Sequence, residues 1–324
     1  SALDAPPTSE TPADAGPPAH PGDYRKAIAR PDRLDPVPEG MTLWHDYGAF
    51  ALYKVSTTTV DRLSDETRRM IEMPADMNHL LIDAYPFDTQ RDTFAAIPDH
   101  LRITQPEGPA LHLIQFVGPI KQAWLRAVEK AGAVPIHYIA NYGYLVWADG
   151  SARARLDHMA QAKDFLQFSA PHQPYFKIGA SLRQRLSETD RKHNAHREKR
   201  VRVTIQMYDH PGKKGTETLI AGLVHEQLSP WTPILDYQNV IATVDTADLA
   251  TLAAQPDVVW IGEYGARERF DEVQNQILAG NFDAAQSGPS GPGYLDWLAG
   301  YNLSTEPADY PIVDVIDDGI GNGI

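Results

Sequence analysis

The feature that most constrains this chain is a pattern that recurs three times. Two apolar segments joined by a short turn are followed by a helical stretch and by one more apolar segment. The paired segments lie at 46–55, 140–149 and 236–245, and each contains a tyrosine at or beside the turn. Apolar runs separated by turn residues predict strands, and apolar residues at helical spacing predict helices. The chain therefore predicts three related units built from both kinds of element.

The second and third copies carry an additional front half. Residues 111–116 and 201–207 predict one strand each, and apolar residues at helical spacing follow at Ile120–Ala131 and Ile220–Val224. Both complete copies therefore predict the order strand, helix, strand, strand, helix, strand, with both helices on one face of the sheet. The first copy predicts only the back half, closed by a strand at His79–Tyr85.

Hydroxyl side chains stand where the last helix of each copy should begin. Ser56 or Thr57 precedes the first of these helices, Ser151 the second and Thr246 the third. Serine and threonine at this position accept a hydrogen bond from a free backbone N–H of the first turn. We therefore expect these residues to cap the three helices.

The strands at 144–147 and 258–261 have large apolar residues on both faces. Helices cover only one face of each predicted sheet, so the other face would expose a large apolar patch. Two interpretations remain open. Either the repeats cover one another, or a second folded surface, in this chain or in another, covers the free face.

Two segments outside the repeats have an unusual composition. Residues 1–40 hold nine of the 26 prolines and almost no large apolar residue. Such a segment cannot bury enough apolar surface to offset the entropy of ordering, so we expect a disordered, extended tail. Residues 191–200 are strongly basic in an acidic chain and predict a solvated linker helix.

The histidines near these segments offer no complete metal site. His193 and His196 are three residues apart, but no carboxylate or third ligand is spaced to complete a site. His225 and Glu226 lack the second histidine of a zinc-binding helix. We expect no metal or other cofactor at either position.

Charge and composition exclude several classes of function. The chain has 29 Lys+Arg and 43 Asp+Glu residues, a formal net charge of −14, which disfavours nucleic acid and anionic membrane surfaces as partners. It contains no cysteine, which excludes disulfides, thiolate metal sites and a cysteine nucleophile. No apolar run approaches the roughly 18 residues of a membrane-spanning helix.

The strongest chemical motif lies near the C-terminus. Residues 311–320 predict a strand that ends in Asp317, Asp318 and Gly319, and carboxylates at such a strand end can point into a crevice of an open α/β sheet. Two chemistries fit poorly. The glycine spacing is wrong for a dinucleotide-binding turn, and Asp314 and Asp317 are misspaced for a phosphotransfer aspartate.

A third chemistry fits better, because Val315–Ile320 resembles the first catalytic motif of the subtilisin-like serine proteases. In that family a hydrophobic pair precedes the aspartate, and Ser, Thr or Asp and then Gly follow it. The complete repeats resemble the inhibitory propeptide domain of the same family, although tandem copies depart from its usual single domain. The resemblance implies an α+β fold of tandem ferredoxin-like βαββαβ propeptide-type domains, followed by the first strand of an α/β subtilisin-like domain.

This interpretation predicts six segments, which are a tail, a partial ββαβ repeat, a propeptide-like domain, a basic linker, a second propeptide-like domain and a truncated catalytic domain. Their expected bounds are 1–40, 41–108, 109–190, 191–200, 201–268 and 269–324. The chain starts at Ser1 without a basic segment leading into an apolar one, and it stops directly after the motif strand. We interpret it as a fragment or processed form.

The resemblance also implies an activity. Asp317 would be the catalytic aspartate of an Asp-His-Ser triad, whose members follow in that chain order in the subtilisin family. No matching histidine or serine motif occurs in these residues, so we expect this fragment to be catalytically incomplete. The resemblance implies a secreted or periplasmic endopeptidase. Its own catalytic domain and protein substrates would be the partners, and calcium would be possible only in the missing catalytic part.

One rival from another class stays open. A non-enzymatic protein built from βαββαβ repeats could bind another protein or a small effector. The sequence that follows residue 324 distinguishes the two, since a protease needs a histidine motif and, later, a serine motif.

Overall fold

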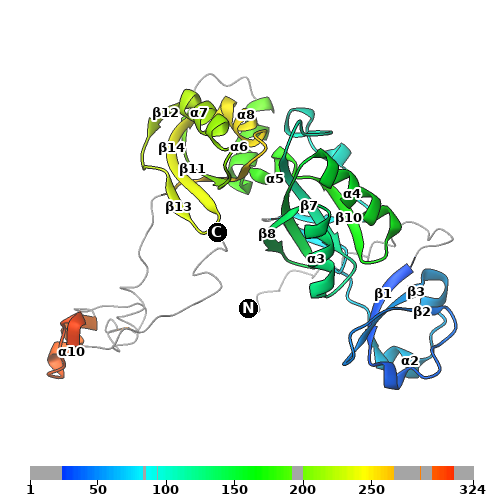
Figure 1. Cartoon of the computed structure of the whole chain (residues 1–324). Coiled ribbons are helices and arrows are strands. Elements are labelled where there is room, and N and C mark those ends of the chain that lie inside the picture. The colour runs from blue at the N-terminus through cyan, green and yellow to red at the C-terminus, as the bar shows by residue number, and fades with distance from the viewer. Residues whose placement is uncertain are drawn as a thin grey trace, which may run out of the picture. The chain divides into compact units, whose positions relative to one another are not determined.

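A computed structural model describes residues 24–82, 85–92, 94–191, 200–265, 285 and 294–309 (Figure 1). The chain divides into two compact units, Ser1–Tyr264 and Gly265–Ile324. The first unit combines helices with several antiparallel sheets, which confirms the predicted α+β class at this level.

The first sheet has the strand order β2-β3-β1-β4. Two short helices, α1 (Thr57–Val60) and α2 (Asp65–Met70), lie in the chain between its last two strands and contribute to its core. Its strands are β1 (Tyr24–Ala29), β2 (Met41–Asp46), β3 (Ala51–Ser56) and β4 (Ile71–Glu72).

The prediction of a disordered tail over 1–40 is wrong for its last part. Strand β1 lies between β3 and β4, and a short 3-10 helix follows it at Pro31–Arg33. Six residues without proline are enough to form the strand, because Ala27 and Ala29 are buried under its neighbours. Residues 1–23 lie outside the described residues.

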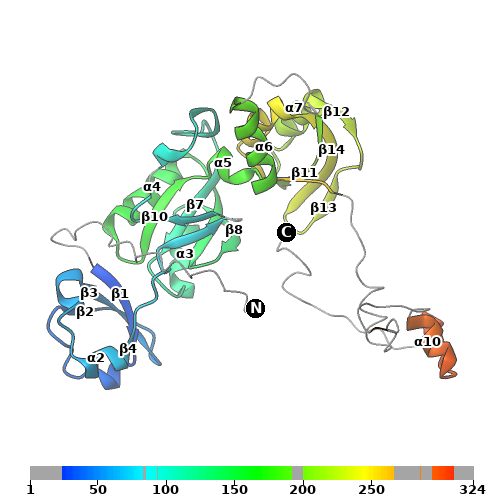
Figure 2. The same cartoon turned by 180° about the vertical axis from the view of Figure 1, so that it is seen from behind.

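The segment His79–Tyr85 does not close the first sheet, contrary to the prediction. Strand β4 takes that place, pairing with β1 (Figure 2). Strand β5 (His79–Ile82) instead pairs with β6 (Tyr85–Asp88) in a separate hairpin, and short 3-10 helices follow at Phe94–Ala96 and Asp99–Leu101. The apolar run in β5 identified a strand but not its partner.

The second module, residues 110–171, has the element order strand, helix, strand, strand, helix, strand, as its sequence predicts. The strand order is β10-β7-β9-β8, and all neighbours are antiparallel. Its elements are β7 (Ala110–Phe116), α3 (Gln122–Lys130), β8 (Val134–Ile139), β9 (Gly143–Ala148), α4 (Gly150–Ala162) and β10 (Leu166–Pro171).

The third module, residues 200–263, repeats this topology with the strand order β12-β14-β11-β15. A small additional strand pairs with β14. The elements are β11 (Arg200–Tyr208), α7 (Lys214–Leu223), β12 (Val224–Gln227), β13 (Thr232–Ile234), β14 (Tyr237–Asp245), a 3-10 helix (Thr246–Asp248), α8 (Leu249–Ala253) and β15 (Val258–Glu263).

The predicted apolar stripes face the cores. In the second module Trp124 and Val128 of α3 are buried against Ile114 and Phe116 of β7. In the third module Ile220 of α7 is buried in the core that holds alternate residues of β11. Both helices of each module therefore cover one face of its sheet.

The helix caps differ from the prediction. Ser56 precedes α1 but its side chain makes no capping bond, and the helix at Thr246 begins after Asp245. Asp149 caps α4 by accepting a hydrogen bond from Ala152 N at 2.8 Å, while the Ser151 hydroxyl donates to the same carboxylate at 2.9 Å. The carboxylate of Asp149, two positions before the predicted Ser151, therefore acts as the cap.

Helices α5 (Pro174–Lys177) and α6 (Ala180–Arg191) lead from the second module into the third. The backbone of Gly179 donates to Ile261 O of β15 at 2.8 Å, and Leu111 N donates to Pro256 O at 2.9 Å. These backbone bonds join the two modules directly. The predicted linker helix at 191–200 falls almost entirely outside the described residues.

In the second unit the structure describes α10 (Tyr294–Gly300) and a 3-10 helix at Pro307–Asp309. The apolar turn predicted at 294–298 forms part of α10, and the ring of Trp297 in this helix lies 4.7 Å from that of Tyr301, which follows the helix. None of the helices in the described residues combines the length and the apolar character that crossing a membrane requires.

Candidate functional site

The second and third modules differ on the sheet face that their helices do not cover. The central strands can be matched through Ile114-Gln115 in β7 and Ile205-Gln206 in β11. On the helix-free face the second module then has Leu111, Leu113 and Gln115, and the third module has Arg202, Thr204 and Gln206. The two faces thus differ in polarity at equivalent positions.

The helix-free face of the second module is buried under the β5–β6 hairpin. Leu80, Ile82 and Phe87 of the hairpin share one core with Leu111 and Leu113. A Cβ atom at Gly143 in β9 would lie 2.3 Å from Leu80 Cδ2, so glycine is needed for this close approach. The same chain therefore covers this face, although a hairpin and not another repeat does so.

The Gln115 amide ties the hairpin to this sheet. Its oxygen accepts hydrogen bonds from Thr89 Oγ1 at 2.5 Å and Gln167 Nε2 at 2.6 Å. Its nitrogen donates to Asn141 O at 2.9 Å and to Met77 O at 3.4 Å. A buried polar side chain that satisfies its bonding groups in this way fixes one arrangement of the segments around it.

The corresponding face of the third module, called the open face below, remains partly exposed. Its side chains come from β11, β14 and β15, and none of them is buried: Thr204, Gln206, Tyr208, Asn239, Ile241, Thr243 and Trp260. A Cβ atom at Gly262 would lie 1.7 Å from Trp260 Cη2, so the indole lies across that glycine. The open face is a mixed aromatic and polar surface.

At the centre of the open face one polar group lacks a partner. Gln206 Nε2 donates to Asn239 Oδ1 at 3.1 Å. The Asn239 Nδ2 group is shielded from solvent, yet it donates to no acceptor in the described residues. An unpaired buried donor costs free energy, and a docking partner that supplied an acceptor would remove that cost.

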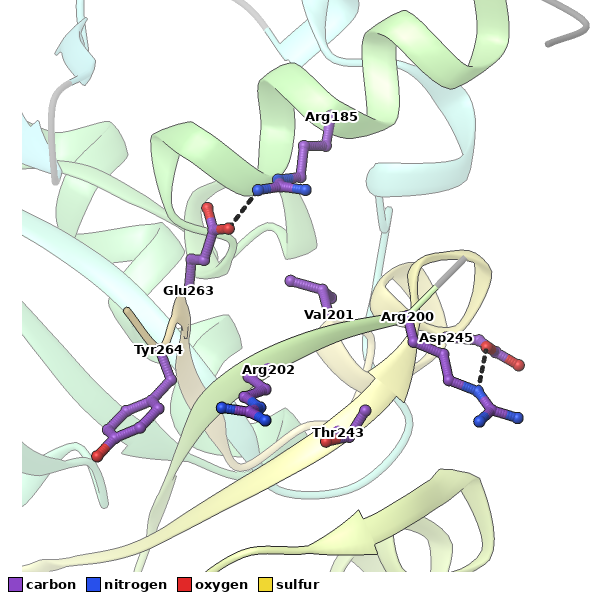
Figure 3. Close-up of a pocket in the computed structure, with 8 residues that line it drawn as sticks. All are labelled: Arg185, Arg200, Val201, Arg202, Thr243, Asp245, Glu263 and Tyr264. Atoms are coloured by element: carbon purple, nitrogen blue, oxygen red, sulfur yellow. Dashed lines mark hydrogen bonds and ion pairs between the residues drawn. The ribbon is translucent and has the colours of Figure 1, made fainter. Parts of the chain in front are cut away.

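One end of the open face opens into a pocket of about 770 Å³, shown in Figure 3. Arg185 of α6 is paired with Glu263 at 2.5 Å, and Arg200 lies 3.8 Å from Asp245. The third arginine, Arg202, forms no side-chain hydrogen bond or ion pair with the described residues. Val201, Thr243 and Tyr264 complete the lining. Strand β15 ends here, so the chain leaves the module beside this pocket.

A buried ionisable cluster lies in the third module where it meets α5. Asp257, which is 1% exposed, accepts hydrogen bonds from Thr216 Oγ1 at 2.6 Å and from His210 at 3.0 Å. Lys177 donates to Gln255 O at 2.7 Å, and its burial lowers the pKa of this amine to about 7, although Asp257 opposes the shift. These groups join α5 to the third module and do not face its open side.

A serine, a histidine and an aspartate meet in the second module but do not form a catalytic triad. Ser169 Oγ donates to Asp157 Oδ1 at 2.6 Å and lies 2.8 Å from His112 Nε2. Because the serine proton is directed at the aspartate, His112 must donate and cannot act as the base. Burial lowers the pKa of His112 to about 3, so the ring is neutral.

Most of the residues that the sequence suggested for catalysis or metal binding have no described position in the structure. Asp317, Asp318, His193 and His196 lie outside the described residues. His225 Nε2 lies 2.9 Å from Asp245 Oδ2. In the part of the chain that the structure describes, no three potential ligands come together to hold a metal ion.

Sequence reasoning missed the difference between the two helix-free faces. A signal was present, because the alternate residues of β7 are Leu, Leu and Gln where those of β11 are Arg, Thr and Gln. Polar residues at alternate positions indicate a face open to water. Reading the two repeats against each other would have separated the covered face from the open one.

Comparison with known proteins agrees with the assignment of the hairpin to the second module. Residues 78–169 match the model of a family described as a domain of unknown function (DUF8729). The matched stretch begins at the hairpin and ends in β10, so it treats the hairpin and the second module as one piece. No curated protein and no solved structure matches the chain.

Proposed function

We propose that this chain is the N-terminal part of a subtilisin-like serine endopeptidase precursor. In this proposal the second and third modules are ferredoxin-like domains of the propeptide type. They assist folding of the catalytic domain and inhibit it. Residues 269–324 begin that catalytic domain and carry Asp317.

The observation that carries the proposal is the open face of the third module. A propeptide-type domain must present one sheet face to the enzyme and then send its C-terminal segment toward the substrate cleft. The open face is free of helices, and β15 ends beside it at Glu263. The motif with Asp317 follows in the same chain, so the order of parts suits a domain that docks on what comes after it.

The covered face of the second module suggests how the tandem copies divide the work. The β5–β6 hairpin occupies the surface that a propeptide-type domain would use for docking. We therefore assign docking and inhibition to the third module. The second module would hold the third in place through α5 and the backbone bonds at Leu111 and Gly179.

Asp317 has a supporting role in the proposed reaction. Its carboxylate would accept a hydrogen bond from a histidine ring, fix the tautomer of that ring and stabilise the imidazolium formed when serine attacks the scissile carbonyl. The histidine and the serine would come from sequence beyond these 324 residues. The chain by itself should therefore cleave no peptide. The proposal also includes export from the cytoplasm, which the resemblance to the subtilisin-like proteases implies.

An inhibition assay tests the proposal. The full chain is added to a subtilisin-type endopeptidase, and cleavage of a chromogenic peptide is followed. We expect inhibition by the wild-type chain and its loss in Thr204→Lys, because the new ammonium would be buried on the open face. Thr42→Lys on β2, at an exposed position, is the matched control. Absence of inhibition at high micromolar concentration would contradict the proposal.

The reading frame supplies an independent test. We expect a histidine motif within roughly the next hundred residues and a serine motif later, in the chain order of this protease family. If the complete gene ends without them, the protease assignment is wrong.

One observation favours the rival function, a protein that binds a small effector. The pocket beside the open face presents Arg202, whose guanidinium pairs with no side chain among the residues that the structure describes, and arginine binds carboxylates and phosphates well. Thermal denaturation with citrate and with inorganic phosphate tests this rival. A rise in Tm that Arg202→Gln abolishes, together with no inhibition of the enzyme, would favour it over the propeptide function.

A further inference from the structure

The hairpin between β13 and β14 has an unusual residue at its tip. Ile234 pairs with Tyr237, so Leu235 and Asp236 form a two-residue turn. Leu235 has a backbone φ of +51°, and its side chain is 90% exposed. Turns of this length normally place glycine or asparagine at a positive φ. A leucine here carries backbone strain and exposes its apolar side chain to water.

The other non-glycine residues with a positive φ have a local explanation. Asn141 and Asn302 belong to a residue type that tolerates this conformation. Lys163 ends α4, where a left-handed residue is usual, and the ring of Tyr142 packs against the core of the second module. Leu235 neither ends a helix nor packs into a core. No packing or helix-ending role inside the described fold therefore accounts for the backbone strain at this residue.

The position of Leu235 connects it to the open face. Tyr237 lies on that face two residues before Asn239, and its partner Ile234 is 54% exposed. The Tyr237 hydroxyl lies 3.1 Å from His137 Nδ1 of the second module. The base of the hairpin is thus held between two modules, while its tip projects from the end of the open face opposite the arginine pocket.

The charges beside the tip restrict the class of partner. Asp236 follows Leu235 directly and makes no side-chain hydrogen bond or ion pair with the described residues. Asp209 lies close by, where it pairs with Lys213 and accepts a hydrogen bond from Gln238 at 2.8 Å. An unpaired carboxylate beside the leucine repels anionic lipid surfaces and suits a protein socket with a basic side chain at its rim.

We propose that Leu235 is an anchor that inserts into an apolar socket of a protein partner, with Asp236 facing a basic residue at the rim of that socket. The inference rests on the proposed function, in which the partner is the catalytic domain docked on the open face. It adds a specific contact outside the sheet face and explains why a strained, exposed leucine occupies the tip.

The variant Leu235→Asn separates anchoring from folding. Asparagine tolerates a positive φ better than leucine and removes an exposed apolar side chain, so the variant should have an equal or higher Tm. Loss of the buried leucine contact should weaken inhibition of a subtilisin-type endopeptidase by roughly tenfold or more. The expected result is therefore a gain in stability together with a loss of binding, measured on the full chain.

The matched control is Leu43→Asn, because Leu43 is a half-exposed leucine on β2 in the first sheet. It should leave inhibition unchanged. Unchanged inhibition by Leu235→Asn, or a lower Tm in this variant, would overturn the anchor while leaving the proposed function intact. If the wild-type chain itself does not inhibit, the proposed function fails, and the anchor fails with it.

Discussion

The second and third modules share one topology and use it in two ways. In the second module the hairpin that precedes the repeat is buried on the helix-free face and tied there through Gln115. In the third module the same face carries polar side chains and stays partly exposed, and the equivalent Gln206 donates a hydrogen bond to Asn239 of its own sheet. The strand order alone does not decide whether a face is core or surface.

The difference teaches how a duplicated fold can acquire two roles. A sheet with helices on one face needs a cover for the apolar groups of its other face, either from the same chain or from a partner. The second module buries that face under a hairpin of the same chain, as a supporting role in the proposed function requires. The third module keeps mixed polar and aromatic groups there, which tolerate water and still allow docking. Each prediction below tests this contrast at equivalent positions.

The largest effect should come from truncating matched residues on the two faces. Leu145 pairs with Leu113 in the second module, as Ile241 pairs with Thr204 in the third. Leu145 is 2% exposed, so Leu145→Ala should cost about 2–5 kcal/mol. Ile241→Ala should cost below about 1 kcal/mol, because its site is already partly hydrated. Chemical denaturation measures both. Equal losses would mean that the open face is as buried as the covered one.

Acid should destabilise the chain through two histidines at the second module and its junction with the third. Burial lowers the pKa of both His112 and His172 from 6.5 to about 3. Between these values the unfolded chain binds protons that the folded chain does not. Stability should therefore fall as pH drops from about 6.5 to about 3, by up to about 1.4 kcal/mol per pH unit and histidine.

Urea denaturation at a series of pH values checks this prediction. His112→Asn should reduce the slope of stability against pH, whatever it does to stability at neutral pH. Thr42→Asn at an exposed position of β2 changes no titratable group and is the control, which should leave the slope unchanged. An unchanged slope in His112→Asn would show that this ring is not held neutral by the fold.

A smaller difference in stability is expected between alanine variants of the two equivalent glutamines, Gln115 and Gln206. Gln115→Ala removes the oxygen that accepts the short hydrogen bonds from Thr89 and Gln167 and leaves these two donors their longer bonds to Asn78, which should cost about 1–3 kcal/mol. Gln206→Ala removes one bond on a partly exposed face and should cost about 0.5–1.5 kcal/mol or less. Hydrogen exchange at the hairpin amides adds a local readout. Faster exchange there only in the Gln115 variant is expected, and identical behaviour of both variants would contradict the contrast.

Much of the fold followed from periodicity. The strands and helices of both complete repeats were predictable because their apolar residues recur at strand or helical spacing, as in β7, α3 and β11. The closing strand of the first sheet was not predictable in this way. The apolar run at 80–82 indicates a strand, but it does not determine which other strand this one will pair with.

The candidate site was predictable to a smaller extent. The sequence indicated a surplus apolar face, yet its cover by the hairpin depends on long-range contacts such as Thr89 with Gln115. Strand β1 was missed because averaging over forty residues hides a run of six. The role of Asp317 stays a prediction, since that residue lies outside the described part of the chain.

The last and smallest test concerns the flat indole on the open face. Gly262→Ala places a methyl group where the Trp260 ring lies, so the ring must move away from the sheet. Gly222 in α7 has open space around its Cα, and Gly222→Ala should stabilise the chain by about 0.5–1 kcal/mol through helix propensity. The two alanines should thus change Tm in opposite directions. Only Gly262→Ala should alter inhibition, because only that substitution changes the shape of the open face on which we propose that the enzyme docks. If Gly262→Ala stabilised the chain as much as Gly222→Ala, the indole would not be seated on the sheet, and the open face would lack the aromatic floor on which its docking role depends.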